Sequence, residues 1–62
     1  MPYIIKQTFQ RKASDTQLIR YLSGYVNGVS LWENKEKAQQ FDYRFEAANM
    51  ARKFKHCKIE KI

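Results

Sequence analysis

The dipeptide Asn27-Gly28, set between two runs of strand-forming residues, most constrains the fold of this chain. Asn and Gly tolerate positive φ, which a type I′ turn requires at both of its central residues. Such a turn joins two antiparallel strands, so residues 18–26 and 29–32 are predicted to form a β-hairpin. Gly24 inside the first of these strands indicates a bulge or a close backbone approach.

Two further strands are predicted near the ends of the chain. Residues 3–9 alternate with period two and place Tyr3, Ile5 and Phe9 on one face, and their β-branched and aromatic content favours a strand. Residues 58–62 are predicted to close the chain as another strand.

A helix is expected to begin near Asp42 or Tyr43. Steps of 100° per residue from Tyr43 give an apolar stripe that an amphipathic helix would turn toward a sheet. The residues of this stripe are Tyr43, Ala47, Met50, Ala51 and Phe54. Two alanines in the stripe would let the helix approach the sheet closely.

The predicted elements give the order β-β-β-α-β and one α+β domain that spans residues 1–62. The economical arrangement is a small, antiparallel-rich sheet with one helix packed on one face. A domain of 62 residues buries only about 60% of the surface that its unfolded chain exposes. Such a core leaves little room for an enclosed active site.

Charge and cysteine content indicate the setting in which the chain works. The 12 Lys and Arg residues exceed the 6 Asp and Glu residues, and a net charge of +6 favours anionic partners. The single cysteine, Cys57, cannot form an internal disulfide, which fits a reducing compartment. No signal peptide and no apolar stretch of the ~20 residues that a membrane span needs are recognised, so a cytoplasmic location without membrane contact is expected.

A resemblance adds to this interpretation, and the residues that carry it are spread over nearly the whole chain. They are Tyr3-Ile4-Ile5-Lys6, Tyr21-Leu22, Trp32, Ala38-x-x-Phe41, Glu46-Ala47 and Lys58-Ile59-Glu60. With these residues the chain resembles small uncharacterised proteins encoded by phages and prophages of Gram-positive bacteria. The resemblance implies an early phage gene product and brings no catalytic residues with it.

The chain departs from that pattern at the start of the expected helix. Proteins of this kind have Ser, Thr or Asp where Tyr43 stands, and an acidic residue where Phe45 stands. The departure weakens the N-cap at position 43, and Asp42 is expected to replace it as the capping acceptor.

No combination of residues in the sequence points to catalysis. His56 and Cys57 are the only His and the only Cys, and as neighbours on a strand they would point to opposite faces. One His, one Cys and scattered carboxylates do not supply the ligands of a metal site. We therefore expect a non-enzymatic protein without a cofactor or a metal.

A candidate surface for binding a protein partner lies on the expected helix. Phe45, Asn49 and Arg52 follow the spacing i, i+4, i+7 and share one helical face, away from the apolar stripe. Phe45 either faces solvent as an interface residue or tucks under the preceding loop. Trp32 is either a core anchor under the helix or a fourth, half-exposed interface residue, because Trp is enriched among binding hot spots.

A second candidate surface would bind nucleic acid. Arg11 and Lys12, in the polar loop expected over residues 10–16, and Arg20, Tyr21 and Tyr25, on a strand, would together form a basic and aromatic sheet face. Single-stranded nucleic acid is bound by aromatic stacking and phosphate pairing on such faces.

The preferred hypothesis is a phage-type binding module that docks on a host protein and modulates or inhibits it. Host takeover or interference with host defence, for example inhibition of a CRISPR nuclease, is the expected setting. The alternative is a small, basic nucleic-acid-binding protein. The chain is expected to be a monomer, or a homodimer paired through an edge strand.

Overall fold

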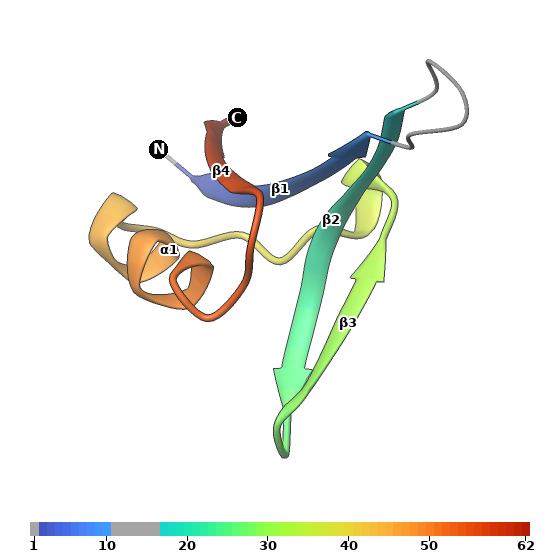
Figure 1. The fold of residues 1–62 in the computed structure, drawn as a ribbon. Coiled ribbons are helices and arrows are strands. Elements are labelled where there is room, and N and C mark those ends of the chain that lie inside the picture. Colours follow the sequence, from blue (N-terminus) through green and yellow to red (C-terminus); the bar gives the residue numbers. More distant parts are fainter. Residues whose placement is uncertain (1, 11–16) are drawn as a thin grey trace.

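The computed structural model describes residues 2–10 and 17–62, which form a four-stranded antiparallel sheet and one α-helix (Figure 1). The order of the strands in the sheet is β3-β2-β1-β4. The elements are β1 (Tyr3–Gln10), β2 (Gln17–Val26), β3 (Val29–Glu33), the 3-10 helix η1 (Lys35–Lys37), α1 (Arg44–Ala51) and β4 (Cys57–Lys61). The predicted α+β class and β-β-β-α-β order are confirmed.

The β2–β3 hairpin has the predicted turn. Asn27 has φ 52° and Gly28 has φ 80°, so both central residues adopt positive φ as a type I′ turn requires. The predicted irregularity at Gly24 is also present, because the register shifts between Leu22 and Gly24. Figure 1 shows this hairpin extending away from α1.

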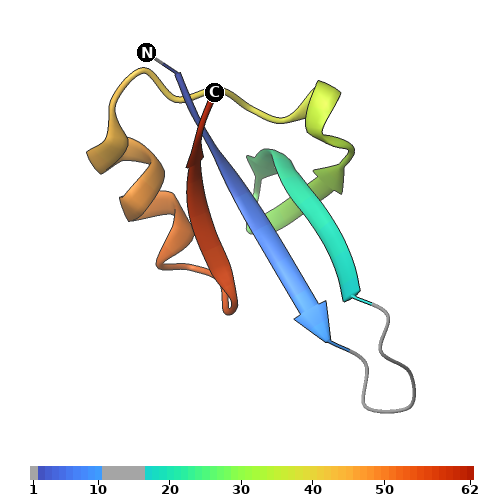
Figure 2. The same ribbon diagram turned by 90° about the horizontal axis from the view of Figure 1, so that it is seen from above.

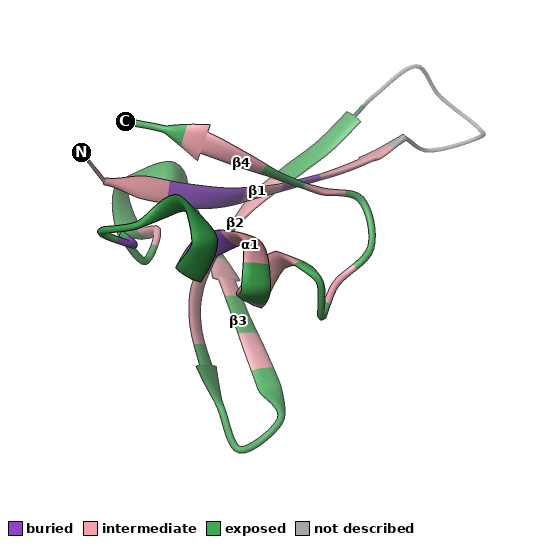
Figure 3. Cartoon of the chain, turned by 90° about the vertical axis from the view of Figure 1, so that its left-hand side faces the viewer, coloured by how far each residue is buried: buried purple, intermediate pink, exposed green. Residues whose placement is uncertain are grey.

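The central strand β1 divides the apolar residues between two faces of the sheet. Ile5 lies opposite Ile59 on β4, and both lie on the face that packs against α1, which we call the helix face. Ile4 lies on the other face, which we call the opposite face. Ile4 and Ile5 are both fully buried, so both faces of β1 are covered at this point. Figure 3 shows the buried residues gathered on β1 and near α1, while the tip of the hairpin is exposed.

The main core lies on the helix face. Its buried members come from four segments and are Ile5, Leu22, Phe41 and Ala47. The fully buried Ala47 allows α1 to approach the sheet closely, as the two alanines of the stripe indicated. Met50, Ala51 and Phe54 pack against the same core, and Figure 2 shows α1 alongside β4.

The segment that contains η1 contacts the sheet near Ile4 at two points. Lys35 on η1 forms an ion pair of 3.1 Å with Glu60, which is the direct partner of Ile4 across the ladder. Two backbone hydrogen bonds of 2.8 Å each join Tyr3 and Phe41 and fasten the end of this segment beside β1. The sequence did not predict these contacts.

The start of α1 differs from the expectation. Tyr43 is the N-cap, is 61% exposed and makes no side-chain capping bond, so it does not belong to the buried stripe. The helix begins at Arg44, and Asp42 precedes the N-cap residue and does not replace it. The helix ends at Ala51, after which Phe54 still reaches the core through a turn.

The loop expected over residues 10–16 falls mostly outside the described part of the chain. Gln10 belongs to β1, and residues 11–16 are not described. Within residues 2–10 and 17–62, no helix has the length and apolar character needed to cross a membrane.

Candidate binding surface

The most exposed aromatic side chains of the described chain stand at the start of α1. Phe45 is 64% exposed, and its ring stacks on that of Tyr43 with 5.5 Å between centroids and 22° between planes. Of the two alternatives for Phe45, the structure therefore shows the solvent-facing one. The pair presents a large apolar surface to solvent, which is the kind of patch that marks interaction sites.

The other residues predicted for this helical face are also exposed. Asn49 and Arg52 lie one and two turns beyond Phe45, and both face solvent. Ala47 and Met50 turn toward the sheet instead. The spacing i, i+4, i+7 thus predicted a solvent-exposed face of α1 that is distinct from the side facing the core.

Trp32 lies elsewhere, on the helix face of the sheet. Its ring packs edge-on against Phe54 with 5.1 Å between centroids, and its Nε1 donates a 2.8 Å hydrogen bond to the Ser30 hydroxyl. The Arg20 guanidinium lies 4.7 Å from the centre of the ring. Trp32 is half-buried against the core, and these contacts favour its interpretation as an anchor.

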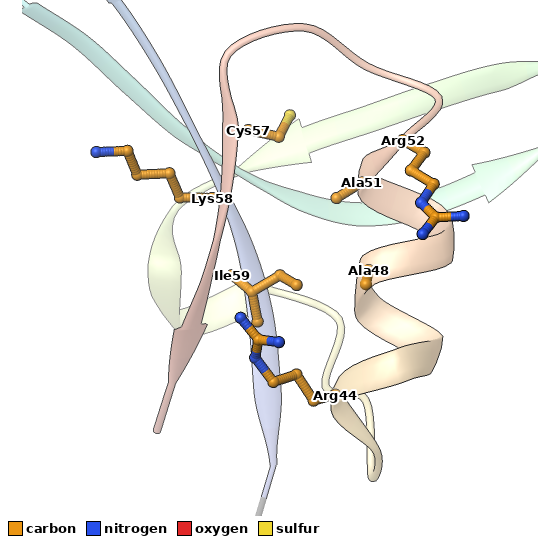
Figure 4. A pocket seen from close by; sticks show the side chains of 7 residues that line it. All are labelled: Arg44, Ala48, Ala51, Arg52, Cys57, Lys58 and Ile59. Atoms are coloured by element: carbon orange, nitrogen blue, oxygen red, sulfur yellow. The ribbon is translucent and has the colours of Figure 1, made fainter.

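An open groove of about 510 Å³ runs between α1 and β4 (Figure 4). The lining residues from α1 are Arg44, Ala48 and Ala51, and Arg52, the residue directly after the helix, also lines the groove. Those from β4 are Cys57, Lys58 and Ile59. Figure 4 shows Ile59 and the two alanines between the elements as an apolar floor, while Lys58 points away from α1.

The two arginines give this groove a positive charge. None of the described residues that line it is acidic. The ion pairs found within the described residues use other cations, since they join Lys35 to Glu60 and Lys37 to Glu33. In that part of the chain Arg44 and Arg52 thus keep their charge available for an anionic partner.

The groove opens beside the free edge of the sheet, because β4 is the outermost strand on this side. The Thr8 N–H donates to the His56 carbonyl at 3.2 Å, and the Ile62 N–H donates to the Pro2 carbonyl at 3.1 Å. In an antiparallel ladder, alternate residues direct their backbone groups toward the neighbouring strand and the residues between them direct theirs away. The residues of β4 whose backbone groups face outward are therefore Cys57, Ile59 and Lys61.

The candidate nucleic-acid residues are not all brought together. Arg20 and Tyr25 lie on the helix face, where both approach the cluster of Trp32 and Phe54. Tyr21 is the neighbour of Arg20 in the strand and its cross-strand partner is Lys6, which places it on the opposite face. Arg11 and Lys12 lie outside the described residues.

His56 and Cys57 do not form a nucleophile and base pair. His56 has φ 61° and packs its ring against Phe9, with 5.5 Å between centroids. The Cys57 thiol donates to the Lys55 carbonyl at 3.5 Å. Burial raises the pKa of the Cys57 thiol above its ordinary value of 9.0, against the smaller, opposing effects of a hydrogen bond with Gln7 and of the Arg20 charge. A raised pKa disfavours the reactive thiolate.

Among the described residues, no three His, Cys, Asp or Glu side chains gather closely enough to hold a metal ion. Comparison with known proteins adds no assignment, because no family model, curated protein or solved structure matches the chain. The surface of α1 and the adjoining groove are therefore interpreted from their own geometry.

Of the residues Arg44, Ala48 and Arg52 that line the groove, only Arg52 was predicted from the sequence as a candidate. Their spacing carried a signal, since residues 44, 48 and 52 lie four apart and share one side of a helix. The spacing does not determine where α1 docks on the sheet. It therefore could not show whether the side of residues 44, 48 and 52 faces solvent or the edge of a strand.

Proposed function

We propose that this protein is a non-enzymatic binding module that docks on a partner protein through the exposed face of α1. Phe45 is the central contact, with Asn49 and Arg52 beside it. The observation that carries the proposal is the stacked pair of Tyr43 and Phe45, because large aromatic side chains held in solvent are costly unless a partner covers them. Aromatic and arginine side chains also dominate the binding energy of interfaces.

The partner that we propose is a host protein whose activity the module modulates or inhibits. This part of the proposal is supported by the resemblance to small phage and prophage proteins. Host takeover or anti-defence activity, such as inhibition of a CRISPR nuclease, in the cytoplasm of the host cell is the corresponding setting. Trp32 contributes to this interface at most indirectly, because Phe54 and Arg20 already pack against its ring.

The proposal is tested by capture from host lysate with a matched pair of variants. Phe45→Ala removes the exposed ring, while Leu31→Ala removes a comparably exposed apolar side chain on β3. We expect a defined protein to be captured by the wild type and by Leu31→Ala, with and without nuclease. Phe45→Ala should weaken its binding by about 1–3 kcal/mol, as truncation of a hot-spot residue does. Equal capture by both variants would remove Phe45 from the interface.

A second candidate function is binding of nucleic acid. The favouring observation is the net charge of +6 together with cations that lie over aromatic rings, Arg20 over Trp32 and Lys53 over Tyr25. Binding of this kind weakens steeply with salt, because each phosphate contact releases counterions. Anisotropy titrations with single-stranded and double-stranded oligonucleotides at low and high salt test it, and no binding at micromolar protein would exclude it.

A further inference from the structure

We propose that the groove between α1 and β4 binds an extended acidic segment of the partner protein, which adds to the free edge of β4 as another strand. The inference rests on the proposed function, because it specifies the chemistry of the protein partner. It adds a site that the exposed face of α1 does not contain, and Arg52 is the residue that the two surfaces share.

The backbone of β4 supplies the first part of the argument. The N–H and C=O groups of Cys57, Ile59 and Lys61 point away from β1, as the bonds from Thr8 to His56 and from Ile62 to Pro2 determine. A free edge of this kind is a template for an extended peptide, and main-chain hydrogen bonds then supply affinity. Any strand that docks here runs directly beside α1.

The spacing of the side chains supplies the second part. Figure 4 shows α1 and β4 side by side, with Arg44 at one end of the helix and extended toward Ile59. Arg52 stands at the other end, with its side chain on the side of the helix away from β4, and a rotamer change would turn it toward a bound carboxylate. Eight residues of helix separate the Cα atoms of these arginines by about 12 Å. Positions i and i+4 of an extended strand are about 13 Å apart and lie on one face. An acidic residue at each of these positions, with an apolar residue at i+2, therefore matches the groove.

Charge selects an acidic segment over a second copy of this chain. Pairing β4 with its own counterpart would place two copies of the groove, each with Arg44 and Arg52 in its lining, along one shared edge. Each copy carries a net charge of +6, so the two copies would repel each other. An acidic strand instead places carboxylates beside arginines, which bind them with charge-assisted hydrogen bonds.

The test uses the full chain and a labelled synthetic peptide with glutamate at positions i and i+4, leucine at i+2 and threonine at the positions between them. Fluorescence anisotropy measures the dissociation constant. A peptide with lysine in place of both glutamates controls for charge. We expect the glutamate peptide to bind and the lysine peptide not to bind. Similar affinities for the two peptides would overturn the proposal.

Two sets of variants separate the side-chain contribution from the backbone contribution. Arg44→Gln combined with Arg52→Gln should weaken binding of the glutamate peptide by about tenfold or more, whereas Lys37→Gln on η1 should leave it unchanged. Lys61→Pro removes one outward N–H without breaking the β1–β4 ladder. It should bind about fivefold more weakly than Lys61→Gln, which removes the charge alone. If Lys61→Pro unfolds, peptides N-methylated at the amides that face β4 test the same contact.

The remaining outcomes point to other occupants. A single-stranded oligonucleotide that binds and is released by the same arginine changes would make the groove a phosphate site and overturn the proposal. A dimer in sedimentation that Lys61→Pro dissociates would assign the edge to a second copy and overturn it equally. Failure of the peptide to bind while lysate capture still depends on Phe45 would reject the groove and leave the proposed function in place.

Discussion

The side chains of Arg20 and Gln7 are joined by a 2.6 Å hydrogen bond, in which Arg20 Nε donates to Gln7 Oε1. Gln7 Nε2 in turn donates to the Lys55 carbonyl at 3.0 Å. One amide, only 4% exposed, thus connects β2 to the turn that leads from α1 into β4. That turn forms one end of the basic groove, so Gln7 helps to position α1 against β4.

Replacing Gln7 by Leu should lower the free energy of unfolding by about 1–3 kcal/mol, because the Lys55 carbonyl and the Arg20 guanidinium both lose a partner. Urea unfolding followed by circular dichroism measures this change. Gln39→Leu is the matched control, since that side chain is exposed, and it should leave the midpoint nearly unchanged. Equal midpoints for the two variants would show that the Gln7 amide contributes no net stability.

Gly28→Val should destabilise the chain by about 1 kcal/mol or more through backbone strain at positive φ. Apart from the glycine itself and its two chain neighbours, no atom of the described residues lies within 4 Å of the position that a Cβ would take at Gly28, so a clash with another part of the fold would not explain the loss. Gly24→Ala is the control. A Cβ there meets Leu31 at an ordinary 3.7 Å and needs no unusual φ, so the urea midpoint should change little. Equal losses at both glycines would contradict the turn geometry.

Local chemistry made the strands and the hairpin predictable. Asn27-Gly28 sets a turn type through the φ values that these two residues tolerate, and period-two alternation in residues 3–9 assigns Ile5 to the covered face. Both signals act over a few residues and depend little on the rest of the fold. The same holds for the solvated face of Phe45, Asn49 and Arg52.

Features that depend on how distant segments dock were not predictable. Ile4 is fully buried on the opposite face, where Lys35 of η1 reaches its cross-strand partner Glu60, and nothing near Ile4 in the sequence indicates this. Tyr43 fits the apolar period of the helix, yet it is the N-cap residue and stacks on Phe45. The period of a helix does not show where its first turn begins.

Only part of the candidate surface was predicted, because the groove also depends on how distant segments dock. Helical spacing places Arg52 on the same face as Phe45. The groove also needs the edge of β4, and the position of this edge depends on the pairing of β4 with β1, a strand at the other end of the chain. The sequence predicts the two elements separately. Their arrangement around a basic groove comes from the way in which Ala47 and Ala51 let α1 pack near Ile59.

The Cys57 thiol should react slowly with iodoacetamide in the folded chain. Burial, as the main cause, raises the pKa of Cys57 above 9.0, so the thiolate forms at higher pH than in the unfolded chain. The thiol's contribution to stability is therefore fully present below the unfolded-state pKa and is lost as pH rises through the folded-state pKa. Alkylation rates between pH 7 and 11, with and without urea, test this. An inflection at lower pH in the folded chain would contradict it.

Phe54→Ala should destabilise the fold far more than Phe45→Ala. Phe54 packs against Trp32 and Tyr25, with centroid distances of 5.1 and 5.9 Å, and against the buried core. Its truncation should cost about 2–3 kcal/mol of unfolding free energy, less than for a fully buried Phe because the ring is only half-buried. Phe45 contacts Tyr43 in solvent, so its truncation should cost about 0.5 kcal/mol or less.

Urea midpoints and the fluorescence of Trp32 distinguish the two sites. Phe54→Ala should shift the emission of Trp32 to longer wavelength, because the ring loses the neighbour that shields it. Phe45→Ala should leave that emission unchanged, since Phe45 stands on the outer side of α1. If Phe45→Ala unfolds the chain as severely as Phe54→Ala, then Phe45 is a core residue. Its loss of binding would then report unfolding, and the exposed face of α1 would no longer support the proposed docking surface.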